Sequence, residues 1–194
     1  MIQIPDNQNA FLDFDDVVAL NTEIKTLTSK IITTTAGETD RARLLFNWVR
    51  DNIPHSKDIN SEIVTCSAPD VLAKGTGICF AKAHLLAAMM RYAKIPCGFC
   101  YQIFQNPENL NAGPRSLHGL NAVFMQETNA WHRIDPRGNR EDVHAEFSLE
   151  KESLAFPELD FLDNCIYAQP LNSVVNSLNN ATSISSLWPM LPTA

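Results

Sequence analysis

The amino-acid sequence predicts an α+β fold, in which a run of helices is followed by a small, mostly antiparallel sheet. Up to residue 94, apolar residues recur at intervals of three and four, which is typical of helices that bury one face. From residue 97 to residue 135, short segments rich in aromatic and branched residues alternate with turns, which is typical of strands. We expect the most apolar helix to pack on this sheet.

Two amphipathic helices are expected first. The apolar positions of the first run from Val17 to Ile31, and those of the second from Ala42 to Ile53. Thr39 or Asp40 is the expected N-cap of the second helix, and Pro54 lies just past its end.

A short helix over residues 68–74, capped by Ser67 and ended by Gly75, leads into the central helix. The central helix, expected over residues 78–94, is apolar nearly all round and is therefore predicted to be mostly buried. A polar strip runs along it, where we expect His84 at the surface. The strip is formed by His84, Arg91 and Lys94.

Three strands follow, at residues 97–104, 117–125 and 130–135, with a polar loop at 105–116 between the first two. Beyond residue 147 the pattern weakens. The segment "PLNSVVNSL" predicts a short helix, and the last dozen residues are expected to form a loosely packed tail.

We expect one domain over residues 1–194. It divides into an N-terminal helical segment (1–37), a core (40–140) and a C-terminal extension (148–194).

Composition restricts the function classes. The net charge of −7 argues against nucleic acid or anionic membranes as partners, since both need clustered Lys and Arg. The N-terminal residues lack the features of a secretory signal, and the five cysteines are an odd number. Reduced thiols in a cytoplasmic protein are therefore expected. No cofactor or metal is expected, and the oligomeric state is left open.

A thiol at the start of the central helix is the main functional signal. Cys79 follows "GTGI" and opens the helix. A helix N-terminus favours a thiolate, and the free N–H groups of its first turn can stabilise an oxyanion. A thiol enzyme also needs a histidine within hydrogen-bond reach and a group that orients this histidine.

His118 and Asp135 are the expected partners of this thiol. His118 lies on the second strand, on the face expected to meet the central helix, and Asp135 ends the third strand. If the hairpin is centred between Gln126 and Glu127, the two residues lie directly opposite each other. If the register shifts by one pair, they are neighbours on the same face. The sequence leaves both registers open.

These segments resemble the transglutaminase-like superfamily. The resemblance covers about residues 40–140 and rests on "GTGICFAKAHLLAAMMRYAKIPCGFCYQ", "LHGLNAVF" and "WHRIDPRGN", preceded by "FNWVRDNIPHS". It implies a papain-like fold with a Cys79, His118 and Asp135 triad, and chemistry at an amide or acyl carbon. Members of the superfamily act as transglutaminases, proteases, peptide N-glycanases or deamidases, and some have lost activity.

Two departures from the family pattern stand out. Leu120 occupies a position, two residues after the histidine, where many members have an aromatic residue. An upstream oxyanion donor like that of papain-like enzymes is not evident. The weak candidates for the oxyanion site or substrate cleft are Gly77, Gln102 and Trp131.

Two function classes therefore remain. The first is a thiol-dependent hydrolase or acyltransferase whose substrate is a peptide, a protein or a small amide. The second is a catalytically silent binding or scaffold protein on the same fold. A metal or redox site at Cys97 and Cys100 is disfavoured, because residues three apart on a strand point to opposite faces.

Overall fold

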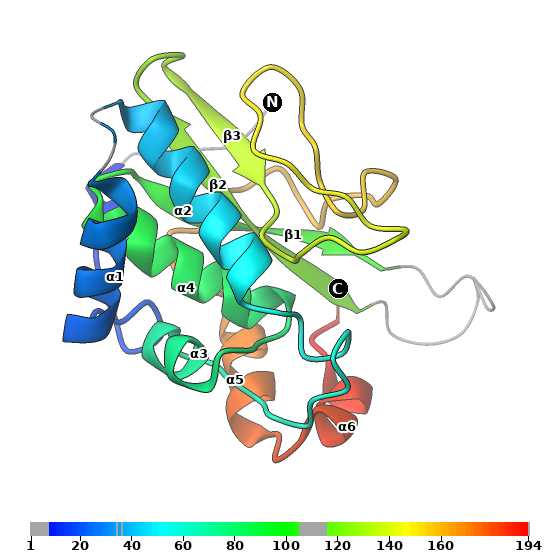
Figure 1. Cartoon of the computed structure of the whole chain (residues 1–194). Helices are drawn as coiled ribbons and strands as arrows, with labels where there is room; N and C mark the ends of the chain where they lie inside the picture. Colours follow the sequence, from blue (N-terminus) through cyan, green and yellow to red (C-terminus); the bar gives the residue numbers. More distant parts are fainter. Residues whose placement is uncertain (1–7, 34, 36, 105–115, 194) are drawn as a thin grey trace.

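The structure is a computed structural model that describes residues 8–33, 35, 37–104 and 116–193. Its elements are η1 (Gln8–Leu12), α1 (Thr22–Ile32), α2 (Glu38–Asn52), α3 (Ala68–Lys74), α4 (Cys79–Tyr92), β1 (Cys97–Ile103), β2 (Leu117–Met125), β3 (Ala130–Ile134), α5 (Asn172–Asn180), α6 (Ile184–Leu187) and η2 (Trp188–Met190). The α+β prediction is confirmed: helices precede an antiparallel sheet of order β1-β2-β3 (Figure 1). The predicted loop at 105–116 lies outside the described residues except for Ser116.

Caps place the helix boundaries, and two differ from the prediction. Helix α1 begins only at Thr22, because the Asn21 side chain accepts a hydrogen bond from the Ile24 N–H (2.9 Å) and so ends the extended segment before it. Helix α2 has Gly37 as its N-cap, without a side-chain cap, so the expectation of a Thr39 or Asp40 cap is wrong.

Helix α4 is the centre of the fold. It contacts α1, α2 and α3 as well as β1 and β2, and every residue from Cys79 to Arg91 is buried. The expectation of a surface His84 is therefore wrong. Its imidazole Nδ1 lies 2.7 Å from the Cys66 carbonyl, and Lys82 donates to the carbonyls of Arg50 (3.1 Å) and Ile53. Backbone oxygens of neighbouring segments thus satisfy polar groups on a helix that is covered on all sides.

The two faces of β2 pack against different parts of the chain. Gly119 lies against Phe80, and the Asn121 amide donates to the Ala83 carbonyl (3.1 Å), so this is the face that meets α4. His118 belongs to the opposite face by alternation, so the expectation that its face meets the central helix is wrong. Residues of that face belong to a second cluster, formed by Phe11, Cys100, Leu120, Ala122, Trp131, Leu154 and Ile166.

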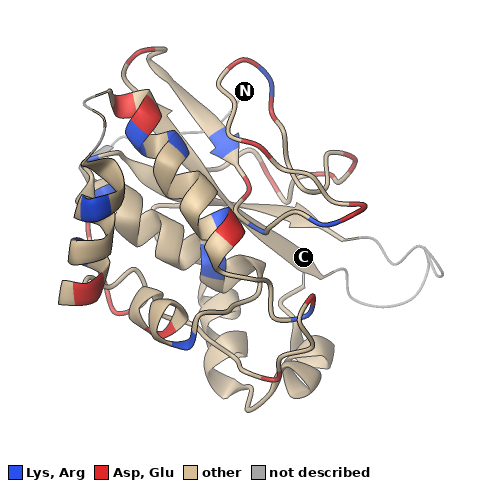
Figure 2. Cartoon of the chain, in the orientation of Figure 1, with Lys and Arg blue, Asp and Glu red and all other residues tan. Residues whose placement is uncertain are grey.

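The C-terminal segment folds back onto the molecule, so the prediction of a loosely packed tail is wrong. Helix α6 is tied to a distant loop by a bond from the Ile184 N–H to the Glu62 carbonyl (3.1 Å), and Leu187 is fully buried. The Leu117 N–H then donates to the Pro192 carbonyl (2.9 Å), next to His118. Residues 164–194 contain no charged residue, and helices α5 and α6 show none in Figure 2.

Candidate active site

A tight bend places Cys79 at the first turn of α4. Gly75 adopts a positive φ of 67°, which favours glycine. At Gly77 a Cβ would lie 2.9 Å from the Thr65 hydroxyl and 3.0 Å from the Ala81 Cβ, so only glycine fits closely there. The N-cap residue Ile78 makes no side-chain cap hydrogen bond. The first N–H groups of α4 are therefore not occupied by a side-chain cap, and Cys79 faces a cavity.

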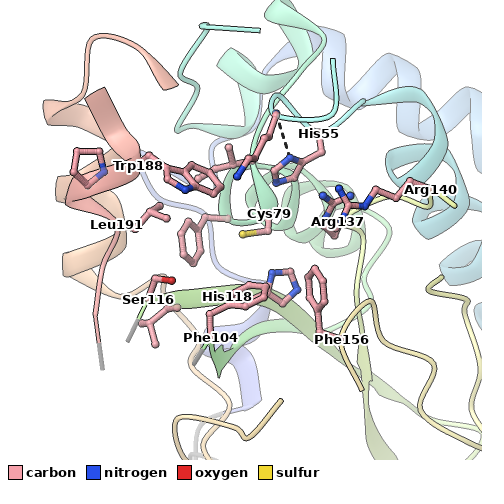
Figure 3. A pocket seen from close by; sticks show the side chains of 15 residues that line it. His55, Cys79, Phe104, Ser116, His118, Arg137, Arg140, Phe156, Trp188 and Leu191 are labelled. Carbon is pink, nitrogen blue, oxygen red and sulfur yellow. Dashed lines mark hydrogen bonds between the residues drawn. The ribbon is translucent and has the colours of Figure 1, made fainter. Parts of the chain in front are cut away.

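His118 connects Cys79 with Asp135. Its Nε2 lies 2.8 Å from the Asp135 carboxylate, and it is also hydrogen bonded to the Cys79 side chain. Asp135 accepts two further bonds, from the N–H groups of Arg137 (3.0 Å) and Ala155 (3.1 Å). His118 and Asp135 are both buried. These contacts bring the three predicted residues together, and Figure 3 shows His118 beside Cys79.

The sheet register explains this meeting. The observed pairs Asn121↔Ile134 and Met125↔Ala130 place His118 and Asp135 on the same face, one pair apart. This is the shifted register of the two that the sequence left open. Since β3 pairs with β2 only from Asn121 onward, the start of β2 extends beyond β3 and lies beside the start of α4.

Charge governs the protonation of this pair. Burial by itself would lower the pKa of His118, but the charges of Asp135 and the Cys79 thiolate, and hydrogen bonds to both, raise it to about 10. Burial would raise the pKa of Asp135, but His118 and the N–H groups of Arg137 and Ala155 hold it below its usual value. The site therefore favours a protonated His118 beside an ionised Asp135.

This raised pKa predicts a pH dependence of stability. The extra stability from protonated His118 is complete below its unfolded pKa near 6.5 and is lost as pH rises through about 10. We expect the difference in free energy of unfolding between the protein and His118→Gln to fall between pH 7 and pH 10. Urea unfolding across that range measures it, and a constant difference would contradict the assignment. Burial and then Arg137 lower the pKa of Lys82 to about 7, so Lys82 also titrates near this range. Both proteins contain Lys82, so its contribution cancels in the difference between their free energies of unfolding.

Aromatic residues from distant segments surround the imidazole. The ring centroid of Phe156 lies 5.0 Å from that of His118 and meets it edge-on, and that of Phe104 lies 5.8 Å away. Leu120, at the position where an aromatic residue was noted as missing, belongs to the second cluster. Phe104, which directly follows β1, and Phe156, in the segment after β3, thus form the wall around His118. The spacing of the sequence motifs could not reveal these two contacts.

The cavity above Cys79 has a volume of about 550 Å³. One side is apolar and the other carries Arg137 and Arg140, both paired with Asp58. The C-terminal segment contributes Trp188 to the apolar side (Figure 3). The Lys57 ammonium lies 3.8 Å from the centroid of the Trp188 ring. The apolar lining residues are Ile78, Phe80, Phe104, Leu117, Phe156, Trp188, Pro189 and Leu191.

The weak candidates from the sequence do not line this cavity. The amide of Gln102 donates to the Phe156 and Leu159 carbonyls (2.9 and 3.3 Å), and Trp131 packs against Phe11 with ring centroids 4.6 Å apart. The Gly77 carbonyl accepts a hydrogen bond from the Ser56 N–H (3.2 Å), so Gly77 stabilises the bend before Cys79 and does not line the cavity. The structure thus corrects the placement of these residues in a cleft.

Sequence reasoning overlooked His55. His55 follows Pro54 just after the end of α2, and an interaction with the helix dipole would be enough to explain a histidine there. In the structure, however, it is buried and lines the cavity. The only signal in the sequence was its place in "FNWVRDNIPHS", within the segment that resembles the family. Cys66 is buried but does not line the cavity.

The position of Trp188 predicts an effect on substrate binding. Trp188 is 42% exposed and lines the cavity, whereas nearby Met190 is 45% exposed and does not. We expect Trp188→Ala to raise KM by about 3- to 10-fold with kcat nearly unchanged, because it removes apolar contact made equally in the ground and transition states. Met190→Ala is the matched control and should change neither constant. Equal effects of both variants in steady-state kinetics would contradict the assignment.

The family profile described as "Transglutaminase-like superfamily" matches residues 25–136, which is more than half of the chain. The chain belongs to the transglutaminase-like superfamily. A candidate cysteine protease from Cytophaga hutchinsonii shares the fold with a TM-score of 0.55 and 18% identity, covering 69% of this chain and 43% of that one. This superfamily member thus spans less than half the length of that protein. The periplasmic domain of TgpA from Pseudomonas aeruginosa gives a TM-score of 0.48 at 16% identity, covering 65% and 45%.

A search of curated proteins found no match. Within the described residues, no helix is long and apolar enough to cross a membrane. In the same part of the chain, no three His, Cys, Asp or Glu residues are grouped as metal ligands would be.

Proposed function

We propose that this protein is a thiol-dependent hydrolase or acyltransferase that acts on an amide or acyl bond through Cys79, His118 and Asp135. The observation that carries the proposal is the hydrogen-bonded series from Cys79 through His118 to Asp135 at the wall of an open cavity. A nucleophile, a base and a group that orients the base are the parts that acyl transfer requires.

The geometry supports the following steps. Because Nε2 of His118 is bonded to Asp135, Nδ1 is the nitrogen available to Cys79. The Cys79 thiolate adds to the carbonyl carbon, and the π electrons of the C=O bond move to its oxygen. Collapse of this adduct breaks the bond to the leaving group, which takes the proton from His118. A thioester remains on Cys79. Water or an amine then adds to its carbonyl carbon while His118 takes up the proton, and the C–S bond breaks, which releases the product and restores the Cys79 thiolate.

We also propose that the protein works in a reducing compartment such as the cytoplasm. The four buried cysteines, Cys66, Cys79, Cys97 and Cys100, are thiols that form no disulfide with one another. Burial raises the pKa of Cys97 and of Cys100 to about 12, so these two thiols are protonated and unreactive at neutral pH.

Alkylation by iodoacetamide tests the proposed nucleophile. At pH 6 we expect Cys79 to react faster than the more exposed Cys165 by about tenfold or more, because only Cys79 has an imidazolium beside it. His118→Gln should remove this advantage. Peptide mass spectrometry gives both rates in one sample. If Cys79 reacts no faster than Cys165 and His118→Gln changes nothing, the proposal is wrong.

A different result of these labelling experiments would favour the alternative, a catalytically silent binding protein. A Cys79 that alkylates rapidly but accepts no acyl group from an active ester, in a protein that unfolds cooperatively, would favour binding over catalysis.

A further inference from the structure

His55 lies across Cys79 from His118 and lines the same cavity (Figure 3). We propose that the Nε2–H group of His55 is the side-chain donor of the oxyanion site, acting together with the backbone N–H of Cys79. This inference rests on the proposed acyl chemistry and assigns a further catalytic residue to it.

A backbone contact determines the tautomer of His55. The Lys57 N–H points to the His55 Nδ1 at 3.3 Å, so Nδ1 accepts and the proton lies on Nε2. Within the part of the chain that the structure describes, Nε2 makes no hydrogen bond. The side chain is 6% exposed and lines the open cavity, so this hydrogen is left for a group bound there.

The position of His55 relative to Cys79 is held by the backbone. His55 forms a parallel bridge with Gly77, two residues before Cys79, and the Ser56 N–H donates to the Gly77 carbonyl (3.2 Å). The Thr76 hydroxyl donates to the Pro54 carbonyl (2.9 Å) and therefore accepts from the Ser56 hydroxyl (3.1 Å). The segment that carries His55 and the bend that carries Cys79 are therefore joined, which is the preorganisation that an oxyanion site needs.

His55 is also neutral in this environment. Burial and then the charge of Arg137 lower its pKa to about 3, and Lys82 and His118 act in the same direction against Asp58. A neutral imidazole with its Nδ1 occupied is a poor base for Cys79, but its N–H remains a donor at neutral pH. His118, in contrast, is protonated at neutral pH, because its contacts with Asp135 and Cys79 raise its pKa to about 10.

The donor acts in the addition step. As the Cys79 sulfur bonds to the carbonyl carbon, the electron pair of the C=O bond moves to the oxygen, which becomes an anion. This oxygen accepts a hydrogen bond from His55 Nε2–H and one from the Cys79 N–H, which the first turn of α4 leaves without an intrahelical partner. When the leaving group departs with the proton of His118, the carbonyl reforms and both bonds weaken.

Two reactions of the same thiol separate this role from others. Alkylation by iodoacetamide displaces iodide at a CH₂ group and forms no oxyanion, whereas acylation by p-nitrophenyl acetate passes through one. We expect His55→Phe, which keeps a ring and removes the donor, to lower the acylation rate by about 10²–10³-fold. Its alkylation rate at pH 6 should stay within about twofold of that of the unsubstituted protein. His55→Gln, which restores an N–H donor, should recover part of the acylation rate, and the exposed His144→Gln is the control.

Each other outcome contradicts the inference. Equal acylation by His55→Phe and the unsubstituted protein excludes an oxyanion role while leaving the proposed function intact. A parallel loss of alkylation and acylation in both His55 variants, with cooperative unfolding retained, would make His55 a residue that supports the thiolate instead. Absence of acylation in the unsubstituted protein overturns the proposed function and this inference with it.

Discussion

Alanine at either Cys79 or His118 is expected to lower acyl turnover to the same residual rate, about 10³–10⁴-fold below that of the unsubstituted protein. The reason is that thiolate and imidazolium act as one unit: neither attack nor protonation of the leaving group proceeds without both. The double variant should therefore be no slower than either single variant. Steady-state rates with an active ester substrate measure this lack of additivity.

Two matched controls accompany these variants. Cys66→Ala removes another buried thiol, and His132→Gln changes a histidine on β3 whose ring contacts the Thr128 hydroxyl (2.7 Å) away from the cavity. Both should retain turnover. Multiplicative losses in the Cys79 and His118 double variant would mean that the two residues act independently, against the proposed triad.

Arg91→Met is expected to lower the free energy of unfolding by about 3–5 kcal/mol, because it leaves several buried carbonyl groups without a donor. The guanidinium of Arg91 donates to the Cys97 carbonyl from two nitrogens (3.1 and 2.8 Å) and to the carbonyls of Asp13 and Ala168. It thereby joins the segment before α1, the start of β1 and the segment before α5. Methionine keeps most of the apolar stem but none of these bonds.

The matched control for this change is Arg43→Met. Arg43 is exposed and pairs with Asp40 on α2, so we expect a change within about 0.5 kcal/mol. Urea unfolding of both variants gives the comparison. If Arg91→Met costs no more than Arg43→Met, the buried bonds do not contribute as the contacts imply.

Local signals in the sequence located the elements well. Ser67 caps α3 by accepting from the Asp70 N–H, and Gly75 ends it with a positive φ, as their residue types predict. The alternation of β1 also placed Cys97 and Cys100 in different clusters, which removes the case for a metal or redox pair. These features depend on neighbours within a few residues, and so they can be predicted without the fold.

The order of Cys79, His118 and Asp135 in their motifs was likewise sufficient to select the candidate site, but not to describe it. His84 was expected at the surface because helical spacing shows which residues share a face, not what covers that face. Trp188 was assigned to a loose tail because its place in the cavity wall depends on contacts of the C-terminal segment with distant residues, such as the bond from the Leu117 N–H to the Pro192 carbonyl.

The sequence by itself therefore determined the class of fold, the family and the three residues most suited to acyl chemistry, since these follow from local spacing and from order along the chain. Only the tertiary structure decided the register that joins His118 to Asp135, the C-terminal wall of the cavity and the place of His55 opposite the thiol. The physical reason is that these features depend on contacts between segments whose sequences do not encode each other's positions. They form only when burial around α4 brings the segments together.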